Sequence, residues 1–103
     1  MQFLLKRGET VLAVLDQCCP SDEMFWLKCE FQPTPAFAEV AAFYEEIRTI
    51  DGDVDRIMEI YDQLSDTGVR LVRLPSGTVI EDFFFILQDE TVFIRYVDPA
   101  DLT

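Results

Sequence analysis

The first third of the chain alternates hydrophobic and polar residues with the period of β-strands. Three segments show the pattern: residues 2–7, 10–15 and 24–31. Gly8 and Glu9 separate the first two segments and can form a tight turn, which predicts a hairpin. In the third segment Phe25 and Leu27 point to one side, and Trp26 points to the other.

The middle third has the period of amphipathic helices. Thr34 suits an N-cap and Pro35 a first helical position, so we predict a helix over residues 35–50. After a break at residues 51–53, a second helix is predicted over residues 54–67, with Asp53 as its cap and Gly68 after its end. The residues expected to pack both helices against the sheet are Phe37, Val40, Tyr44, Ile47, Ile57, Tyr61 and Leu64.

The last third returns to strands, predicted at residues 69–74, 78–87 and 91–96. The longest of them contains the run Phe83-Phe84-Phe85, which favours a central strand covered on both faces, with the three rings in the core. The acidic tail, residues 97–103, is expected to be frayed.

These elements predict an α+β fold in the order βββ-αα-βββ. The short links between strands favour antiparallel pairing, and the two amphipathic helices are expected on one face of the sheet. Two small sheets that flank the helices are the alternative. The length of 103 residues fits a single domain over residues 1–103.

Charge changes this picture most. Twenty acidic residues face eight basic ones, for a net charge of −12, and residues 35–68 carry nine acids and two bases. Half of the residues are hydrophobic, which argues against disorder. Such a field repels nucleic acid and anionic membranes, and it speeds association with a basic protein. We therefore expect a basic protein partner, with no nucleic acid and no membrane.

The order of residues at the N-terminus and the cysteines indicate a cytoplasmic protein. The hydrophobic residues at the N-terminus precede Lys6 and Arg7, which is the reverse of a secretory signal, and no hydrophobic run is long enough to span a membrane. Cys18, Cys19 and Cys29 are odd in number, which suits a reducing compartment. We predict three reduced thiols, and no zinc site because the chain lacks histidine.

The residue types needed for common catalytic sites are largely missing. Without histidine, the serines have no usual base, and the four glycines form no phosphate-binding loop. The run of acids at residues 51–55 resembles the start of a calcium loop, but Arg56 and Asp62 occupy its sixth and twelfth positions in place of Gly and Glu. It is better explained as a helix N-terminus enriched in acids. We predict no catalytic residue, no metal site and no cofactor.

The most specific pattern lies on the second predicted helix. Its members, spaced i, i+4, i+7 and i+11, share one face, called here the acidic ridge: Asp55, Glu59, Asp62 and Asp66. Arg56 lies off this ridge. The ridge is either a solvated face or a docking surface for basic residues. Trp26 is a candidate anchor for the same partner, since Trp is enriched in binding hot spots; packing under a helix is the alternative.

The stretch Trp26-Leu27-Lys28-Cys29-Glu30-Phe31-Gln32-Pro33-Thr34-Pro35-Ala36-Phe37 resembles one in short, acidic, uncharacterised bacterial proteins. In those, the pattern W-x-x-x-x-F-x-P-T-P-A-F precedes a helix. The resemblance implies a strand, a helix start and core aromatic residues, and it implies no activity.

The sequence thus favours a non-catalytic acidic binding protein, for example an immunity-type protein or an inhibitor that docks a basic partner. Two other classes stay open. One is a small-ligand or metal-binding module with a pocket between sheet and helices. The other is an enzyme that uses carboxylates alone.

Overall fold

The structure, a computed structural model, describes residues 2–21, 25–50, 52–88 and 90–96. The predicted tail, residues 97–103, lies outside this range, as does the start of the strand expected at residue 24. The described elements follow in the order β1 (Gln2–Arg7), β2 (Thr10–Pro20), β3 (Leu27–Pro33), η1 (Pro35–Glu39), α1 (Ala41–Thr49), α2 (Val54–Asp66), β4 (Val69–Leu74), β5 (Thr78–Ile80), β6 (Phe83–Gln88) and β7 (Thr91–Tyr96).

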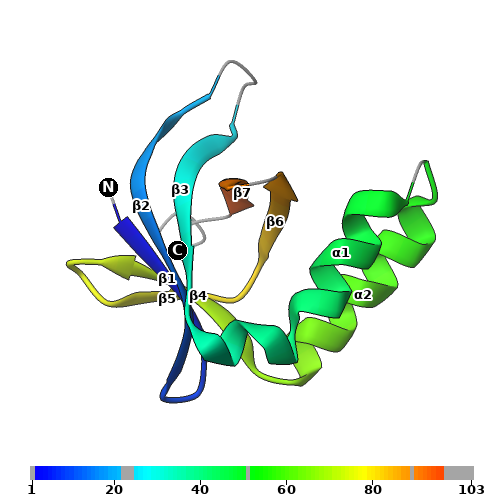
Figure 1. Cartoon of the computed structure of the whole chain (residues 1–103), viewed down its shortest axis with the longest axis horizontal. Helices are drawn as coiled ribbons and strands as arrows, with labels where there is room; N and C mark the ends of the chain where they lie inside the picture. Colours follow the sequence, from blue (N-terminus) through cyan, green and yellow to red (C-terminus); the bar gives the residue numbers. More distant parts are fainter. Residues whose placement is uncertain (1, 22–24, 51, 89, 97–103) are drawn as a thin grey trace, which may run out of the picture.

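The strands form one antiparallel sheet in the order β5-β4-β1-β2-β3-β7-β6 (Figure 1). The predicted α+β class and antiparallel pairing are confirmed, and the alternative of two small sheets is wrong. The first hairpin turns at Gly8, whose φ of 60° lies in the left-handed region that glycine adopts without strain.

The sheet is strongly curled. The ring centroids of Phe3 in β1 and Tyr96 in β7 are 5.4 Å apart, although β2 and β3 separate these strands in the sheet. A flat sheet would hold them about 14 Å apart, since neighbouring strands are spaced by about 4.8 Å. The strands therefore wrap around a core of their own side chains. The fully buried side chains of this core include Phe3, Leu5, Leu12, Leu15, Leu71, Ile80, Phe85 and Ile94.

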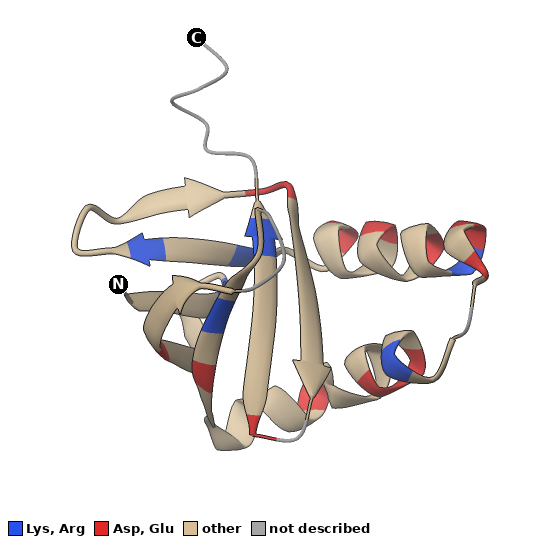
Figure 2. Ribbon diagram, turned by 90° about the horizontal axis from the view of Figure 1, so that it is seen from above, with Lys and Arg blue, Asp and Glu red and all other residues tan. Residues whose placement is uncertain are grey.

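This curvature explains why the helices do not cover one face of the sheet, as we had predicted. They lie side by side beyond the edge strand β6, where they close the opening left by the curled sheet (Figures 1 and 2). Helix α1 packs mainly on β6, and α2 also contacts β4. Of the predicted packing residues, Phe37, Val40, Tyr44, Ile47 and Leu64 are buried.

The predicted order βββ-αα-βββ is wrong in its last part, because four strands follow the helices. Glu81 and Asp82 interrupt the segment predicted as one long strand, and both acids have low strand propensity. At this break the chain passes from β5, at one edge of the sheet, to β6, at the other. Strand β6 is therefore an edge strand, not the central strand that we expected from its three phenylalanines.

The first predicted helix is also divided. Residues 35–39 form the 3₁₀-helix η1, and α1 begins only at Ala41. Pro35 occupies the first helical position as predicted, but the Thr34 hydroxyl does not cap the helix. It donates instead to the carbonyl oxygens of Val11 and Leu12 in β2, at 2.6 and 3.0 Å. Thr34 thus ties the start of the helical segment to the sheet.

The prediction of three reduced thiols is wrong for two of them. Cys18 and Cys29 form a disulfide between β2 and β3, and Cys19 is free and exposed. An irregularity in the pairing of β2 with β3, where Gln17 has a φ of 50°, brings the two Cα atoms to 4.2 Å. Because disulfides are rare in the cytosol, the cysteines no longer argue for a cytoplasmic location, which stays a prediction. Within the described residues, neither helix could span a membrane.

Candidate functional site

Helix α2 carries the acidic ridge and is fixed at both ends as the sequence predicted. The Asp53 carboxylate accepts a hydrogen bond from the Arg56 backbone N–H at 3.1 Å. After the last turn, Gly68 adopts a φ of 93°, a left-handed conformation that ends helices without strain at glycine. Ile60 and Leu64 are buried on the side of the helix that faces the rest of the protein. The helix is therefore held in one orientation relative to the sheet.

The acidic ridge is exposed along its whole length: Asp55, Glu59, Asp62 and Asp66 all face solvent. Figure 2 shows acidic residues recurring along the turns of α2. The ridge is less uniform than we had predicted, because Arg56 does reach it. The Arg56 guanidinium contacts Glu59 at 3.0 Å and Glu46 of α1 at 2.6 Å. These hydrogen bonds, first that of Glu46 and then that of Glu59, raise the pKa of Arg56.

A tyrosine joins the same helix to the edge of the sheet. The Tyr61 hydroxyl donates to the Phe85 carbonyl oxygen at 3.0 Å and accepts from the Phe85 N–H at 3.2 Å. Both backbone groups belong to the edge strand β6, where no further strand follows in the sheet order. Burial raises the pKa of Tyr61, and the hydrogen bond with Phe85 partly opposes that change. Tyr61 thus replaces a neighbouring strand at this point of the edge.

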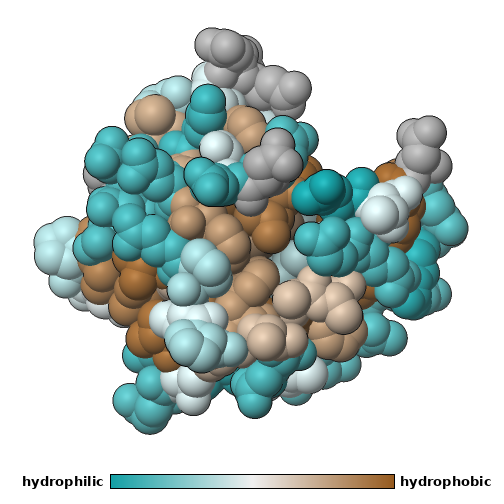
Figure 3. All heavy atoms as spheres, in the orientation of Figure 1, coloured by the Kyte–Doolittle hydropathy of each residue, from teal (hydrophilic) through white to brown (hydrophobic). Residues whose placement is uncertain are grey.

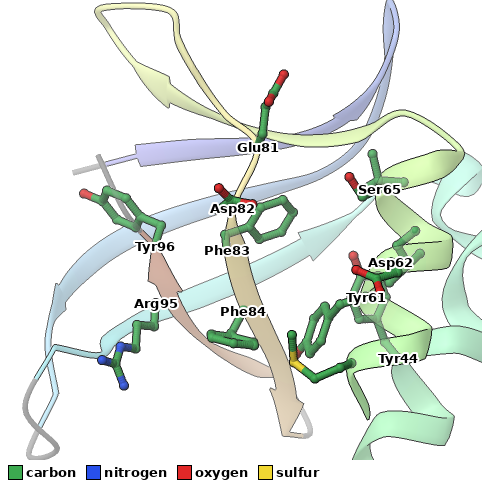
Figure 4. Close-up of a pocket in the computed structure, with 13 residues that line it drawn as sticks. Tyr44, Tyr61, Asp62, Ser65, Glu81, Asp82, Phe83, Phe84, Arg95 and Tyr96 are labelled. Carbon is green, nitrogen blue, oxygen red and sulfur yellow. The ribbon is translucent and has the colours of Figure 1, made fainter. Parts of the chain in front are cut away.

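Beside this junction lies a groove of about 360 Å³ between α2 and the start of β6. We call it the α2–β6 groove. Its walls comprise Tyr44, Met58, Tyr61, Asp62, Leu64, Ser65, Val69, Glu81, Asp82, Phe83, Phe84, Arg95 and Tyr96. In Figure 4 the side chains of Tyr61, Asp62 and Ser65 extend from the helix toward Phe83 and Phe84 on the strand. The groove therefore has an aromatic wall and an acidic rim.

The acids of the rim differ in their partners. Glu81 lies 3.8 Å from Arg70 and points away from the groove in Figure 4. Among the ion pairs of the described residues, none involves Asp62 or Asp82. Arg95 lies on the far side of Phe84 from α2, and its guanidinium stands 5.4 Å from the ring centre of Phe25. Two acids that line the groove, Asp62 and Asp82, thus have no ion pair within the described part of the chain.

Trp26 lies on the outer side of the sheet, next to this groove. It is half-buried, and its ring centre is 6.4 Å from that of Phe84. It does not pack under a helix in the way that we had left open, since its ring partner comes from β6. Phe84 also contacts Tyr61, with ring centres 5.1 Å apart. The three rings form a continuous row from Trp26, just before β3, to Tyr61 of α2.

On the other side of Trp26 is a second pocket of about 460 Å³, here called the outer pocket. It is lined by Pro20, Ser21, Trp26, Lys28, Ile86, Gln88 and Phe93. Phe93 is paired with Ile86 and with Lys28 across the sheet, so these side chains share the outer face. Figure 3 shows hydrophobic residues reaching the surface between the strands and the helices.

The structure thus places only part of the predicted site together. Asp62 and Trp26 lie at the two ends of the aromatic row, while Asp55 and Glu59 lie farther along α2 toward its N-terminus. Sequence reasoning did not single out Tyr61, Asp82 or Phe84 as site residues. Asp82 offered one signal, because two acids interrupt an otherwise hydrophobic run, but we interpreted that run as a single strand.

Metal binding has no support from side-chain clusters. In the described ranges, no three His, Cys, Asp or Glu side chains gather as metal ligands would. Comparisons with protein families, with curated proteins and with solved structures find no match to this chain. The resemblance to short acidic bacterial proteins therefore stays a prediction.

Proposed function

We propose that this chain is a non-catalytic binding protein that docks a basic segment of a protein partner on the acidic ridge and in the α2–β6 groove. One observation carries the proposal. Asp62 of the ridge also lines the groove, where it and Asp82 have no ion pair within the described structure and Tyr61 and Phe84 form an aromatic wall.

This combination suits a cationic side chain with a long hydrophobic stem. Carboxylates supply the opposite charge, and the faces of aromatic rings attract cations within about 6 Å. Arginine fits better than lysine, since its planar guanidinium stacks on rings and pairs with a carboxylate through two hydrogen bonds. The net charge of −12 adds long-range attraction, which raises the association rate.

A concrete form of this function is an immunity-type protein or inhibitor that neutralises a cationic toxin or nuclease. In such a complex, the carboxylates of the ridge would meet the Lys and Arg residues that the partner uses for its own substrate. The support for this form is the charge distribution, which makes it an analogy and not an assignment.

A second candidate function is the binding of a small cationic ligand. The groove lies between a helix and the sheet, which is where ligand pockets often form, and its volume falls within the usual range for them. An arginine side chain and a small guanidinium compound would use the same walls.

The test neutralises the ridge and measures binding of a tryptophan-free peptide of alternating Arg and Gly. The variant carries Asp55→Asn, Glu59→Gln, Asp62→Asn and Asp66→Asn. Calorimetry at 0.01 M and 0.15 M salt should show weaker binding at both, with the larger loss at low salt, where the Debye length is about 30 Å instead of about 8 Å.

A matched control removes the same number of charges elsewhere. It carries Glu9→Gln, Glu30→Gln, Glu45→Gln and Glu90→Gln, all at exposed positions outside α2 and outside the lining of the groove. If the ridge and groove bind the peptide, the control keeps most of its affinity. Equal losses in the two variants would mean that the peptide responds to net charge alone, and the proposed docking surface would be wrong. Guanidinium alone, added as a competitor, distinguishes a small-ligand site from a peptide site.

A further inference from the structure

The α2–β6 groove and the outer pocket share a wall. Phe84 lines the groove and Trp26 lines the outer pocket, and their rings pack against each other at 6.4 Å. Along β6, the groove is bordered by Phe84 and the outer pocket by Ile86, two residues farther on the same face of the strand. Two residues of a strand span about 6.6 Å. The two cavities are therefore neighbours on one surface.

Their chemistry differs. The groove is lined by three acids and one base, Asp62, Glu81, Asp82 and Arg95, whereas among the described residues that line the outer pocket Lys28 is the only charged one. Lys28 would repel a second basic side chain. Pro20 and the polar residues Ser21 and Gln88 also line the outer pocket. Its remaining lining is the ring of Trp26 and the hydrophobic side chains of Ile86 and Phe93, which supply the contacts for a hydrophobic guest.

We infer that the two cavities together read a short extended segment of the partner, with arginine in the α2–β6 groove and a hydrophobic residue in the outer pocket. This inference rests on the proposed function and specifies its partner. In an extended segment, side chains two positions apart point to the same side and lie about 6.6 Å apart, which matches the spacing of Phe84 and Ile86. The recognised pattern is therefore Arg-x-Φ or Φ-x-Arg, where Φ is Leu or Phe.

The contributions of the two cavities to the binding free energy can be measured separately. The arginine contribution depends on charge and is screened by salt. The hydrophobic contribution comes from apolar area removed from water and responds little to salt at these concentrations. Trp26 is the only tryptophan of the chain, so its fluorescence reports on the outer pocket.

The experiment uses pools of tryptophan-free nonapeptides with the other positions randomised among Gly, Ser and Ala. One pool fixes Arg and Leu two positions apart, a second fixes them at adjacent positions, a third replaces Leu by Ser, and a fourth replaces Leu by Glu. We expect the first pool to bind about tenfold more tightly than the second and the third, and to shift the Trp26 emission to the blue. That ratio corresponds to about 1.4 kcal/mol.

Two variants of the outer pocket complete the test. Ile86→Ala removes one wall, and Gln88→Phe fills the pocket from an exposed position without touching the core. Each should remove the advantage of the first pool while the binding of the Arg-Ser pool stays unchanged. The ridge variant should instead weaken all Arg pools.

The outcomes separate this inference from the function on which it rests. If all Arg pools bind equally and the ridge variant abolishes their binding, the proposed function stands and the two-cavity pattern is wrong. If the Arg-Glu pool binds best, Lys28 sets the specificity and the hydrophobic assignment is overturned. If no Arg pool binds, both proposals fall.

Discussion

Two adjacent phenylalanines of β6 belong to different parts of the molecule. Phe85 is completely buried and packs against Tyr44, with ring centres 4.6 Å apart. Phe84 points to the other side of the strand, is 36% exposed and contacts Tyr61 and Trp26. The side chains on the inner face of the sheet, such as Phe85, thus form an ordinary hydrophobic core. The outer face carries the aromatic row of Trp26, Phe84 and Tyr61, which is unusual for a surface. This difference between the two faces marks the candidate site.

The difference continues on the neighbouring strands. On the inner side, Cys29 and Ile94 are buried, and on the outer side Lys28 and Arg95 are exposed among aromatic side chains. A solvent-exposed sheet face normally carries polar residues. Hydrophobic rings interleaved with single cations are instead typical of binding surfaces, in which aromatic residues and Arg are enriched. Substitutions on the inner face should therefore lower the free energy of unfolding, whereas substitutions on the outer face should lower the affinity for a partner.

The largest effect should come from Phe85→Ala. Truncating a fully buried ring removes its packing and leaves a cavity, which costs about 3–5 kcal/mol of unfolding free energy. Phe84→Ala should cost about 1 kcal/mol or less, since that ring is partly solvated. Denaturant melts measure both values. Similar losses for the two variants would mean that the aromatic row is part of the core and would remove the basis of the comparison.

The cysteines give the next largest contrast. Opening the Cys18–Cys29 disulfide, which closes a loop with a sequence separation of 11, should cost about 3 kcal/mol, whereas Cys19→Ser at an exposed position should change stability by less than about 0.5 kcal/mol. Alkylation without reductant should modify one thiol, and alkylation after reduction should modify three. Three modified thiols without reductant would restore our original prediction of a fully reduced protein.

Much of the fold could be predicted from local pattern. The strand at residues 69–74, the helix α2 with its cap Asp53 and its terminal Gly68, and the exposed acidic ridge all follow from periodicity and capping. These features depend on residues close together in the sequence. They need no knowledge of how distant segments meet.

The parts that could not be predicted depend on long-range geometry. The curling of the sheet moved the helices off its face and turned the Phe83–Phe85 segment into an edge strand. The irregularity at Gln17 brought Cys18 opposite Cys29. The site shares this property, since Asp62 and Asp82 come from different parts of the chain and line one groove only because α2 lies beside β6. Periodicity places a residue on a face but does not say which face of another element it meets.

Tyr61 contacts both phenylalanines of this comparison. Its ring packs on the outer Phe84, and its hydroxyl forms hydrogen bonds with the backbone of the inner Phe85. Tyr61→Phe keeps the ring and leaves a donor and an acceptor of the edge strand without this partner. We expect a loss of about 1–2 kcal/mol. Hydrogen exchange should accelerate at the Phe85 amide more than at amides in β1. Unchanged exchange there would mean that water replaces the hydroxyl at no cost.

Because of the same tyrosine, we expect the free energy of unfolding to fall at alkaline pH. Burial raises the pKa of Tyr61 above its ordinary value of 10.0, so the unfolded chain releases this proton at a lower pH than the folded chain does. The stability linked to this group is present below pH 10 and falls as the pH rises beyond it. Melts at pH 9 and pH 11 should show a smaller difference for Tyr61→Phe than for the original chain. Tyr44, whose pKa burial also raises, accounts for a residual difference.

The smallest effects on stability should come from the ridge, and there the contrast lies between two carboxylates of one helix. Glu59 pairs with Arg56, and Asp62 lines the groove. Glu59→Gln should lower stability by about 0.5 kcal/mol or less, because exposed pairs contribute little. Asp62→Asn should leave stability unchanged or raise it by a few tenths of a kcal/mol, since it relieves repulsion with Asp66 four residues away.

Binding of the alternating Arg-Gly peptide should reverse this order. Asp62→Asn removes a carboxylate that faces the groove, whereas Glu59→Gln removes one already engaged by Arg56 and leaves that cation next to the ridge. Calorimetry at low salt should therefore show the larger loss of affinity for Asp62→Asn. A larger loss for Glu59→Gln would place the docking surface nearer the N-terminus of α2 and away from the groove. A residue whose substitution lowers affinity but not stability contributes to binding and not to the fold. We expect Asp62 to be such a residue.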